Sequence, residues 1–416
     1  MRTKSDILII GGGSIGLHAA YYLIEAGRDV TIIDKEAVAQ GSSAGNAGHI
    51  VPSDIIPLAA PGIITTALKW LFDSKNGPFG MKISFDPAYI SWMLRFALSC
   101  TPANVERGIP PLRELGLLSA RNFSELIAIE DFDCSYQQVG VLYPYKIQPM
   151  FENARHEADL VSRHGLEARI LDQDAIREFE PSIQPDVIGG VHYTSDASLN
   201  PGVYLALLAE SVREVAEIHE NTPVTGLEAS NGKINLVRTE NGDFEPVEVV
   251  LAAGAWSPDV LRGLGLKLPV QPARGYSMTM SAPDVGPRNT MLLGERKVAI
   301  TPMGDLLRFT GRLELSNYDT TPNPKRLAGI ERAVREYIKL DETLDVKETW
   351  AGLRPTTPDG LPIIGYAPHL SNLIIATGHA MLGLSLGPGT GQVVAELATG
   401  QETAFDLHPL RAERFA

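Results

Sequence analysis

The sequence predicts an α/β fold, in which a Rossmann-like nucleotide-binding domain carries an inserted α+β domain with a mixed or antiparallel sheet. Three observations lead to this prediction. A complete βαβ pattern occupies residues 6–34, helix-like and strand-like segments alternate at both ends of the chain, and residues 265–315 between them are rich in strand-like runs. With 416 residues, the chain is long enough for two or three domains.

The βαβ pattern begins with DILII at residues 6–10, an apolar run typical of a buried parallel strand. GGGSIG follows at residues 11–16, and LHAAYYLIEAG then has helical apolar spacing up to Gly27. VTIID at residues 30–34 predicts a second strand. Strand, glycine-rich turn, helix and strand therefore follow one another in the order that a dinucleotide-binding unit requires.

The three glycines of this turn and the acid after the second strand predict a dinucleotide site. Gly11 allows the tight turn, Gly13 lets a pyrophosphate approach the backbone, and Gly16 lets the helix pack closely on the sheet. The helix N-terminus would face the pyrophosphate. Asp34 would accept hydrogen bonds from ribose hydroxyls and would repel the 2′-phosphate of NADP. Without this context, the glycines alone could form a turn in an unrelated α/β fold.

The rest of the chain does not continue the doubly wound pattern that a nicotinamide-dependent enzyme usually shows. Helix-like segments lie near residues 111–130, 148–164 and 203–216, and strand-like runs lie at 247–252, 276–280, 297–301, 306–310 and 373–376. A nucleotide-domain pattern returns at VVLAAGAWS (249–257) and at TGHAMLGLSLGPGTGQVVAEL (377–397). This long interruption favours FAD over NAD. We expect an FAD-binding domain of residues 1–62, 197–264 and 345–416, and a substrate-binding domain of residues 63–196 and 265–344.

The glycines at 383–391 have two interpretations. They could bring a second helix N-terminus into the site, which would suit the negative charge of a reduced flavin. Alternatively, they allow close helix packing.

Composition and charge indicate a soluble globular enzyme and exclude several other classes. Apolar residues make up 44% and charged residues 21% of the chain, while the net charge of -14 disfavours nucleic acid as a partner. The only cysteines, Cys100 and Cys134, do not suggest a disulfide scaffold and fit a reducing cytoplasm. No spacing of histidine or cysteine residues suggests a metal site.

The most lipid-like segment is PLAAPGIITTALKWLF, residues 57–72. Pro61 and Gly62 interrupt it, Lys69 adds a charge, and a membrane span needs about 20 apolar residues. We expect a buried or membrane-facing surface helix there. The N-terminal apolar run is too short for a signal peptide. We therefore expect a cytoplasmic protein, with peripheral contact on the inner face of the cell membrane as an option.

Several longer motifs carry a resemblance over essentially the whole chain. They are GGGSIG (11–16), GSSAGNAGHIVPSDIIPLAAPG (41–62), ALKWLF (67–72), RGYSMTM (274–280), KVAITPMGDLLRFTG (297–311), WAGLRPTTPDGLPIIG (350–365) and TGHAMLG (377–383). On these motifs the chain resembles the D-amino acid oxidase superfamily of FAD-dependent enzymes, which includes glycine and sarcosine oxidases. Within it, the chain is most similar to bacterial D-amino acid dehydrogenases of the small-subunit type.

The resemblance implies roles for four residues at catalytic positions. Arg354 matches the family arginine that binds the substrate carboxylate, and its guanidinium could pair bidentately; the alternative is a structural ion pair. Tyr276 would orient the substrate or form a pocket wall, unless it is a core tyrosine. His379 would border the flavin, through its backbone rather than its imidazole. His49 would lie near the flavin without an assigned task.

The resemblance also implies a set of FAD contacts. The expected FAD-binding residues are Gly11, Gly13, Ser14, Ile15, Gly16, Asp34, Lys35, Ser42, Ser43, Asn46, Ala47, Gly48, Val224, Ala253, Gly254, Gly378, Met381, Leu382 and Gly383. The small residues Gly45, Ala47 and Gly48 would let the backbone run close to a large flat ring. Glycine-oxidase relatives often carry an arginine where Met381 stands, so a second cationic anchor is not expected. We expect FAD to be bound non-covalently.

The activity that this resemblance implies is the oxidative deamination of amino acids. Hydride transfer from the α-carbon to FAD would give an imino acid, which water hydrolyses to a keto acid. D-Alanine-like substrates or D-proline and cis-4-hydroxy-D-proline are expected, with L-proline, sarcosine and glycine as lesser options. The expected electron acceptor is a quinone or another respiratory carrier.

Several alternatives stay open at this point. An oxidase of the glycine or sarcosine type would use oxygen, a non-catalytic FAD-binding protein would oxidise nothing, and an NAD-dependent dehydrogenase would contain no flavin. The sequence is also compatible with an oligomer.

Overall fold

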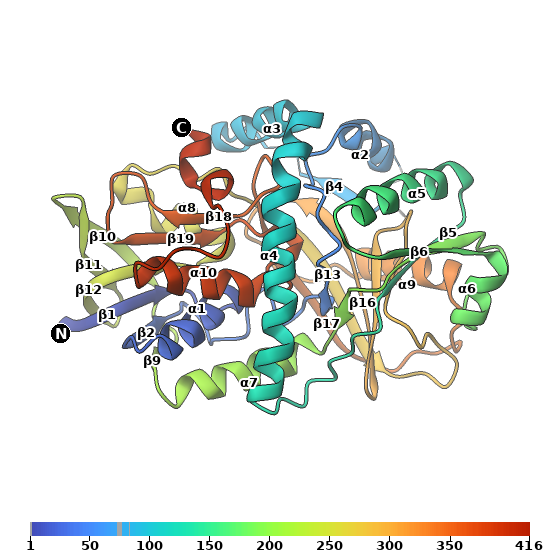
Figure 1. Cartoon of the computed structure of the whole chain (residues 1–416), viewed down its shortest axis with the longest axis horizontal. Helices are drawn as coiled ribbons and strands as arrows, with labels where there is room; N and C mark the ends of the chain where they lie inside the picture. The colour runs from blue at the N-terminus through green and yellow to red at the C-terminus, as the bar shows by residue number, and fades with distance from the viewer. Residues whose placement is uncertain (1, 73–76, 83) are drawn as a thin grey trace.

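The computed structural model describes residues 2–72, 77–82 and 84–416. Two β-sheets lie side by side, and the long helix α4 (Pro102–Ile129) runs across the front of the molecule between them (Figure 1). Helices α2 (Ile63–Phe72) and α3 (Pro87–Ser99) lie together at one edge, close to the C-terminus (Figure 1). The site described below lies between the two sheets.

The first sheet has a parallel centre that is buried on both faces. Its strands follow the order β10 (Val224–Ser230), β11 (Lys233–Thr239), β12 (Gly242–Leu251), β1 (Arg2–Ile10), β2 (Val30–Ile33) and β9 (Glu217–His219), with β19 (Leu373–Thr377) beside β12 and β18 (Ile363–Tyr366) beside β19. Strand β1 is parallel to both β12 and β2. Alternate residues of β1 contact different cores, Ile7 and Ile9 on one face and Leu8 and Ile10 on the other. This explains the uninterrupted apolar run at residues 6–10.

Three helices cover one face of this sheet: α1 (Ser14–Glu25), α7 (Pro201–Arg213) and α10 (Gly387–Ala398). Short elements complete this half of the molecule, namely α8 (Ser257–Val260) and the 3-10 turns Gly254–Trp256, Arg262–Leu264, Ala380–Leu382, His408–Leu410 and Ala412–Phe415. The arrangement confirms the predicted Rossmann-like unit.

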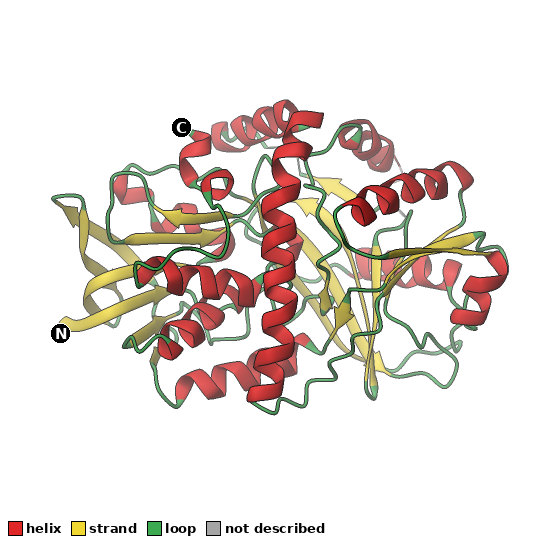
Figure 2. Ribbon diagram, viewed as in Figure 1, coloured by secondary structure: helices red, strands yellow, loops and turns green. Residues whose placement is uncertain are grey.

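The second sheet is mixed and mostly antiparallel. Its order is β17 (Val346–Thr356), β13 (Gln271–Ser281), β16 (Leu306–Leu315), β15 (Val298–Met303), β14 (Met291–Leu292), β5 (Val141–Tyr145), β7 (Gly189–Tyr193) and β6 (Ala168–Asp172), with β4 (Phe79–Met81) beside β16. Helices α5 (Gln148–Arg163), α6 (Gln173–Phe179) and α9 (Pro324–Tyr337) pack around it (Figure 2). A separate two-stranded ladder joins β3 (His49–Ile50) to β8 (Ala197–Ser198).

The expected domain boundaries differ from this arrangement at two places. Strand β17 pairs with β13 in the second sheet, although residues 345–416 were expected in the first domain. Helix α4 packs its leucines against residues of α10 and β18, although residues 63–196 were expected in the second domain. The local sequence of β17 or of α4 does not reveal which sheet or helix it packs against, because that depends on tertiary contacts.

Helix α4 also begins earlier than the predicted start at residue 111. Thr101 caps it by accepting a hydrogen bond from the Asn104 backbone N–H at 3.2 Å. Pro110 and Pro111 lie inside the helix instead of beginning it. Two consecutive prolines remove donors from the middle of a helix, which is why the sequence suggested a later start.

Candidate active site

A cavity of about 750 Å³ lies between the two sheets. Residues from both sheets line it, including Ile10 and Ile33 of the first and Thr310 and Gly352 of the second. It brings together most of the residues that the sequence singled out. These are Gly11, Gly13, Ser14, Ile15, Asp34, Lys35, Ser42, Ser43, Asn46, Ala47, His49, Val224, Ala253, Gly254, Arg354, His379, Met381, Leu382 and Gly383.

The glycine-rich turn presents an open helix N-terminus to this cavity. Gly11 has a φ of +112°, and a Cβ on it would lie 2.5 Å from the Ala252 carbonyl oxygen. Around Gly13, in contrast, a Cβ would meet no atom within 4 Å. Gly13 caps α1 without a side-chain hydrogen bond, so apart from the Ser14 N–H, which donates to Ser43, the first turn keeps backbone N–H groups for a ligand. This is the arrangement that binds an anion at a helix N-terminus.

Three of the predicted FAD-binding glycines do not line the cavity but shape its walls. A Cβ on Gly16 would lie 1.8 Å from the Gly11 carbonyl oxygen, so Gly16 permits the close packing of α1. Gly48 and Gly378 have φ angles of +79° and +80°, a backbone conformation that side chains disfavour. The packing role of Gly16 is the one that the sequence predicted, and Gly48 and Gly378 lie outside the cavity lining, where glycine serves the backbone conformation.

Asp34 lies at the end of β2 and is already bound to the turn. One carboxylate oxygen accepts from the Gly12 N–H at 2.6 Å, and the other accepts from the Glu36 N–H at 2.9 Å. Burial raises the pKa of Asp34, and these two hydrogen bonds oppose the rise. Each carboxylate oxygen keeps a further lone pair for a ribose hydroxyl. Next to it, the Lys35 ammonium lies 3.7 Å from the centre of the Trp256 ring.

The segment 41–48 is held by a buried arginine that the sequence did not single out. The Arg308 guanidinium on β16 donates to the carbonyl oxygens of Ala44 at 2.8 Å and Asn46 at 3.0 Å. Its Nε donates to the Thr279 hydroxyl at 2.9 Å. The signal was present in the sequence, because Arg308 interrupts the apolar run LLRF at residues 306–309, and a buried arginine must find internal partners.

Side chains of the same segment also fasten it to its neighbours. Asn46 donates to the Met381 carbonyl at 3.3 Å and accepts from the Gly48 N–H at 2.9 Å. Ser42 accepts from the Leu353 N–H at 3.0 Å, and Ser43 accepts from the Ser14 N–H at 3.4 Å. These serines and Asn46 therefore connect the segment to β17, α1 and the turn at residues 380–382.

Position 45 needs a glycine because a tryptophan side chain packs directly against it. A Cβ at this position would lie 2.1 Å from the indole of Trp350. A flat ring does require glycine here, and it is a tryptophan of the second sheet. Gly45 also lines the cavity, so the expected contact with a flavin stays a prediction.

His49 is a neutral, donating imidazole. The Thr301 hydroxyl donates to the Ala47 carbonyl at 2.6 Å, so its oxygen accepts from His49 Nε2–H at 3.0 Å. Burial lowers the pKa of His49 to about 4, and a hydrogen bond to the Ile300 backbone opposes this. His49 therefore carries no positive charge at neutral pH.

Arg354 projects from β17 into the cavity with an uncompensated charge. Its guanidinium lies flat on Gly275 of β13, where a Cβ would be 2.4 Å from Cζ. One nitrogen donates to the Arg312 carbonyl, but no carboxylate among the described residues forms an ion pair with it. Burial lowers the pKa of Arg354 to about 10, so it stays protonated at neutral pH. A half-buried cation that faces a cavity in this way, without a carboxylate partner, calls for an anionic ligand.

Tyr276 lies on the other face of β13, which corrects the prediction that it borders the substrate. Successive residues of a strand point to opposite faces, so Gly275 faces the cavity and Tyr276 faces α9. Its hydroxyl donates to Glu314 at 2.8 Å, in a group that also contains Arg274 and Arg326. The core alternative is the one observed.

His379 and the glycines that follow it have different roles: the first residues border the cavity, and the later glycines allow close helix packing. His379 borders the cavity, but its Nε2 lies 3.1 Å from the Thr390 hydroxyl inside the fold, and burial lowers its pKa to about 3. The turn at residues 380–382 borders the cavity, whereas α10 itself begins at Gly387. A Cβ on Gly387 would lie 2.6 Å from Nδ1 of His18 on α1.

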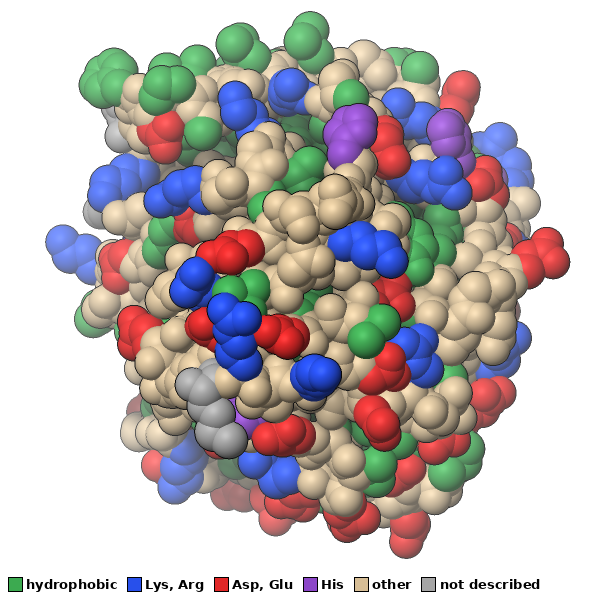
Figure 3. All heavy atoms as spheres, turned by 90° about the vertical axis from the view of Figure 1, so that its left-hand side faces the viewer, with side chains coloured by type: hydrophobic (Ala, Val, Ile, Leu, Met, Phe, Trp, Pro, Cys, Tyr) green, Lys and Arg blue, Asp and Glu red, His purple; other side chains and the backbone are tan. Residues whose placement is uncertain are grey.

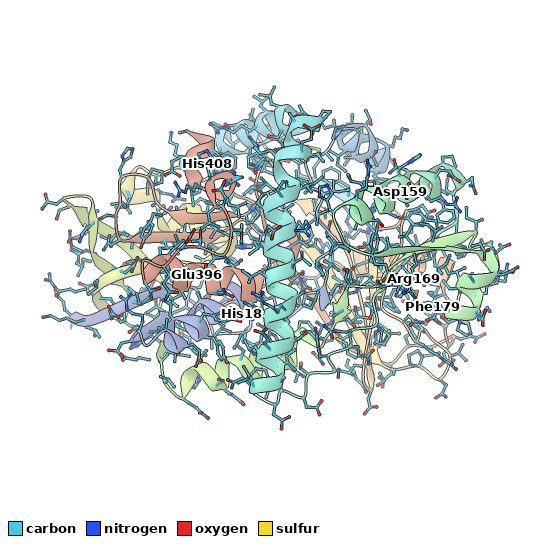
Figure 4. All side chains as sticks on the ribbon, in the orientation of Figure 1. His18, Asp159, Arg169, Phe179, Glu396 and His408 are labelled. Atoms are coloured by element: carbon cyan, nitrogen blue, oxygen red, sulfur yellow. The ribbon has the colours of Figure 1, made fainter. Side chains whose placement is uncertain are left out.

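His18 is labelled in Figure 4 and is buried beside α4. Its Nδ1 donates to the Ser14 carbonyl at 2.7 Å, so its Nε2 accepts from the Tyr204 hydroxyl at 2.8 Å. The later glycines of α10 therefore permit helix packing and do not direct a helix N-terminus at the site.

The described residues fit a dinucleotide of the size of FAD. The open helix N-terminus at Gly13 suits a pyrophosphate, and Asp34 retains acceptors for a ribose. The segment 42–47 and the turn at 381–383 lie on the same cavity and would enclose the rest of the cofactor.

Comparisons with known proteins agree with this geometry. The family model for FAD dependent oxidoreductases (DAO) matches residues 6–397. A D-amino acid dehydrogenase of Paramagnetospirillum magneticum is 33% identical over 98% of this chain and 98% of its own length. One from Neisseria gonorrhoeae is 32% identical over 98% of this chain and 99% of its own length.

Solved structures show the same fold at lower identity. Glycine oxidase from Geobacillus kaustophilus superposes with a TM-score of 0.81 at 22% identity, covering 99% of this chain and 98% of the other. L-Proline dehydrogenase from P. horikoshii superposes with a TM-score of 0.75 at 21% identity, covering 100% and 98%. Both support the fold class predicted from the sequence.

Proposed function

Since this chain belongs to the DAO family of FAD dependent oxidoreductases, we propose that it catalyses the oxidative deamination of D-amino acids. The two relatives named above are D-amino acid dehydrogenases, and each aligns with this chain over nearly its whole length. Bound FAD would supply the two-electron oxidant for the substrate α-carbon. The protein supplies the binding, orientation and charge that the reaction needs.

Arg354 is the observation that carries this proposal. Its guanidinium faces the cavity, is fixed against Gly275, and has no carboxylate partner among the described residues. An α-carboxylate would satisfy it through charge-assisted, bidentate hydrogen bonds. Such an anchor would fix the α-carbon relative to the rest of the site.

The surroundings of the amino group also fit this chemistry. His49 is neutral at the pH of the cell, so it adds no positive charge beside a substrate amine. Its N–H is held by Thr301, which keeps the ring in one orientation. We assign His49 a positioning role and no proton transfer. D-Alanine-like amino acids, D-proline and cis-4-hydroxy-D-proline are the substrates we propose.

We also propose that a lipophilic quinone accepts the electrons and that the protein meets the membrane at α2 and α3. Both helices border the cavity with apolar side chains, such as Leu71 and Phe96. Leu94 and Leu98 of α3 are exposed and do not line the cavity, while Leu68 of α2 is exposed and also lines it. Hydrophobic side chains protrude along the upper edge of the molecule, the edge to which α3 belongs (Figure 3). In the part of the chain that the structure describes, no helix has the length and apolarity to cross a membrane.

Replacing Arg354 with leucine tests the substrate anchor. Losing a buried, charge-assisted pair should cost about 3 kcal/mol, which lowers kcat/KM about 100-fold for D-alanine or D-proline. Arg121→Leu on the exposed face of α4 is the control and should leave kinetics unchanged. Flavin absorbance should be the same in all three proteins. A loss of less than about tenfold would show that Arg354 does not bind the carboxylate.

Anaerobic bleaching of the purified flavoprotein distinguishes the remaining functions. We expect D-amino acids to reduce the flavin, and a quinone or dye to reoxidise it faster than oxygen does. Peroxide release with glycine or sarcosine would indicate an oxidase instead. A yellow protein that no D- or L-amino acid bleaches would be a non-catalytic FAD-binding protein.

A further inference from the structure

Strand β16 contains one extra residue where it passes β13 at the floor of the cavity. The pairing register of the two strands shifts by one residue between Arg274 and Tyr276. Two residues of β16, Arg312 and Leu313, therefore stand opposite Gly275 alone. A β-bulge of this kind leaves its extra residue outside the regular ladder, and such bulges are common next to active sites.

Arg312, the first residue of this bulge, has a left-handed backbone conformation with a φ of +68°. Glycine adopts this conformation freely, but a residue with a long side chain adopts it only where the surrounding structure holds it there. Arg312 is 7% exposed and borders the cavity, so the strained backbone lies at the candidate active site and not in a surface turn. Backbone strain of this kind is often part of how a site works.

The Arg312 carbonyl is the part of the bulge that contacts the proposed substrate anchor, because it accepts a hydrogen bond from Nη1 of Arg354. Arg354 is on β17, and β13 lies between β17 and β16 in the sheet. Its side chain therefore crosses β13 at Gly275, where an added Cβ would be 2.4 Å from the guanidinium. In a regular ladder, carbonyl groups pair with the neighbouring strands. The bulge frees one carbonyl for a side chain that lies on the face of the sheet.

We propose that Arg312 is a positioning residue for the substrate anchor, and that its left-handed backbone conformation is what positions Arg354. This rests on the proposed function, in which Arg354 binds the α-carboxylate of the substrate. With one nitrogen held by the Arg312 carbonyl, the guanidinium keeps a fixed plane and presents its other N–H groups to a bidentate ligand. Without that acceptor the side chain samples several torsions, and each substrate molecule must first order it.

Two variants that differ in backbone preference isolate this effect. Arg312→Gly and Arg312→Val both remove the arginine side chain, so any effect of its charge is common to both. Glycine keeps the left-handed conformation without strain, whereas a β-branched residue strongly disfavours it. We expect kcat/KM for D-alanine to be about tenfold or more lower in Arg312→Val than in Arg312→Gly, because a small displacement of the anchor is enough for such a loss. Arg312→Asn, which tolerates the conformation, should resemble Arg312→Gly.

Propionate, which is alanine without its amino group, separates binding from catalysis. Its carboxylate should bind Arg354 and change the absorbance spectrum of the bound flavin. The dissociation constant should be about tenfold or more higher in Arg312→Val than in Arg312→Gly, because the valine variant must order the guanidinium on binding. In the Arg354→Leu background this difference should disappear, since the carbonyl then has no guanidinium to hold. A purely structural role of the bulge would lower the melting temperature without this dependence on Arg354.

Asn231 supplies the matched control. It is exposed in the turn between β10 and β11, has a φ of +54°, and does not line the cavity. Asn231→Gly and Asn231→Val introduce the same difference in backbone preference away from the site, so they should differ in melting temperature but have equal kcat/KM. Flavin absorbance and melting temperature verify that each variant folds. Arg312→Ala, which disfavours the conformation less than valine does, takes the place of Arg312→Val if that variant does not fold.

The outcomes separate this inference from the proposed function. Equal kcat/KM and equal propionate binding in Arg312→Gly and Arg312→Val, with D-amino acids still reducing the flavin, would overturn the positioning role and leave the deamination standing. A difference in propionate binding that persists in the Arg354→Leu background would also overturn it, because the bulge would then act through another part of the site. A wild-type flavin that no amino acid reduces, in a protein that binds no propionate, would overturn both.

Discussion

Arg354 acts through its immediate surroundings as much as through its own charge. Gly275 gives the guanidinium a flat surface, and the Arg312 carbonyl fixes one of its nitrogens. The sequence motif around Arg354 predicted the residue but not this support. Tyr276 was placed wrongly because its motif does not reveal which face of β13 it occupies, and a shift of one residue along a strand reverses the face.

Gly275→Ala should displace the Arg354 guanidinium without removing it. The added methyl would lie 2.4 Å from Cζ, so the side chain must move. Because small displacements at a reacting centre cost up to about 100-fold in rate, we expect kcat/KM to fall between about 10-fold and 100-fold. Steady-state kinetics on D-alanine measure it. Gly226→Ala on β10 is the control, since nothing lies within 4 Å of its added methyl. Unchanged kinetics in Gly275→Ala would show that Gly275 does not position the arginine.

At the scale of elements, helices and strands with strong periodicity were predictable, but their partners were not. The predicted segments 148–164 and 306–310 correspond to α5 and β16. The connection between residues 45 and 62 has no periodicity, and its conformation depends on residues far away in the sequence. Arg308 is one of these, and Asp196, in the turn before β8, is another.

Asp196 makes the stability of this connection depend on pH. It accepts from the Ser53 hydroxyl at 2.7 Å and from the Ser53 N–H at 3.2 Å. Burial raises its pKa from 3.8 to about 8, and the two hydrogen bonds oppose the rise. Between these pH values the folded protein keeps a proton that the unfolded chain has lost. The contribution of Asp196 to stability is therefore complete below about pH 4 and declines as the pH rises to about 8.

Asp196→Asn should remove this decline, because the amide does not ionise. Relative to the wild type, the variant should gain stability with rising pH, by up to about 1.4 kcal/mol per pH unit. The comparison is made by measuring the melting temperatures of both holoproteins from about pH 5 to about pH 8. Asp159→Asn should instead follow the wild type at every pH. Parallel profiles for Asp196→Asn and wild type would show that Asp196 ionises normally in the fold.

The whole molecule combines a strongly acidic charge with one apolar edge. The net charge is -14, yet exposed basic side chains occur on α2, on α3 and just after β4, namely Lys69, Arg95 and Lys82. Leu94 and Leu98 are 62% and 79% exposed on the same edge. Basic residues beside exposed leucines are typical of a surface that lies on anionic lipid. The sequence indicated the first of these helices through residues 57–72, but only the fold shows that α3 extends the same surface and that both border the cavity.

Leu94→Ser combined with Leu98→Ser should weaken binding to vesicles that contain phosphatidylglycerol. Burying two leucines contributes at least about 2 kcal/mol, so co-sedimentation should show a partition coefficient reduced roughly 30-fold. Activity with a water-soluble dye should stay the same, because these side chains lie outside the cavity, while reduction of a quinone held in the vesicles should fall with binding. The control is Val215→Ser combined with Val247→Ser. It removes two exposed apolar side chains near the first sheet, away from α2 and α3, and so tests for a general loss of apolar surface. Equal vesicle binding by both double variants, or none by the wild type, would contradict a membrane contact at α2 and α3.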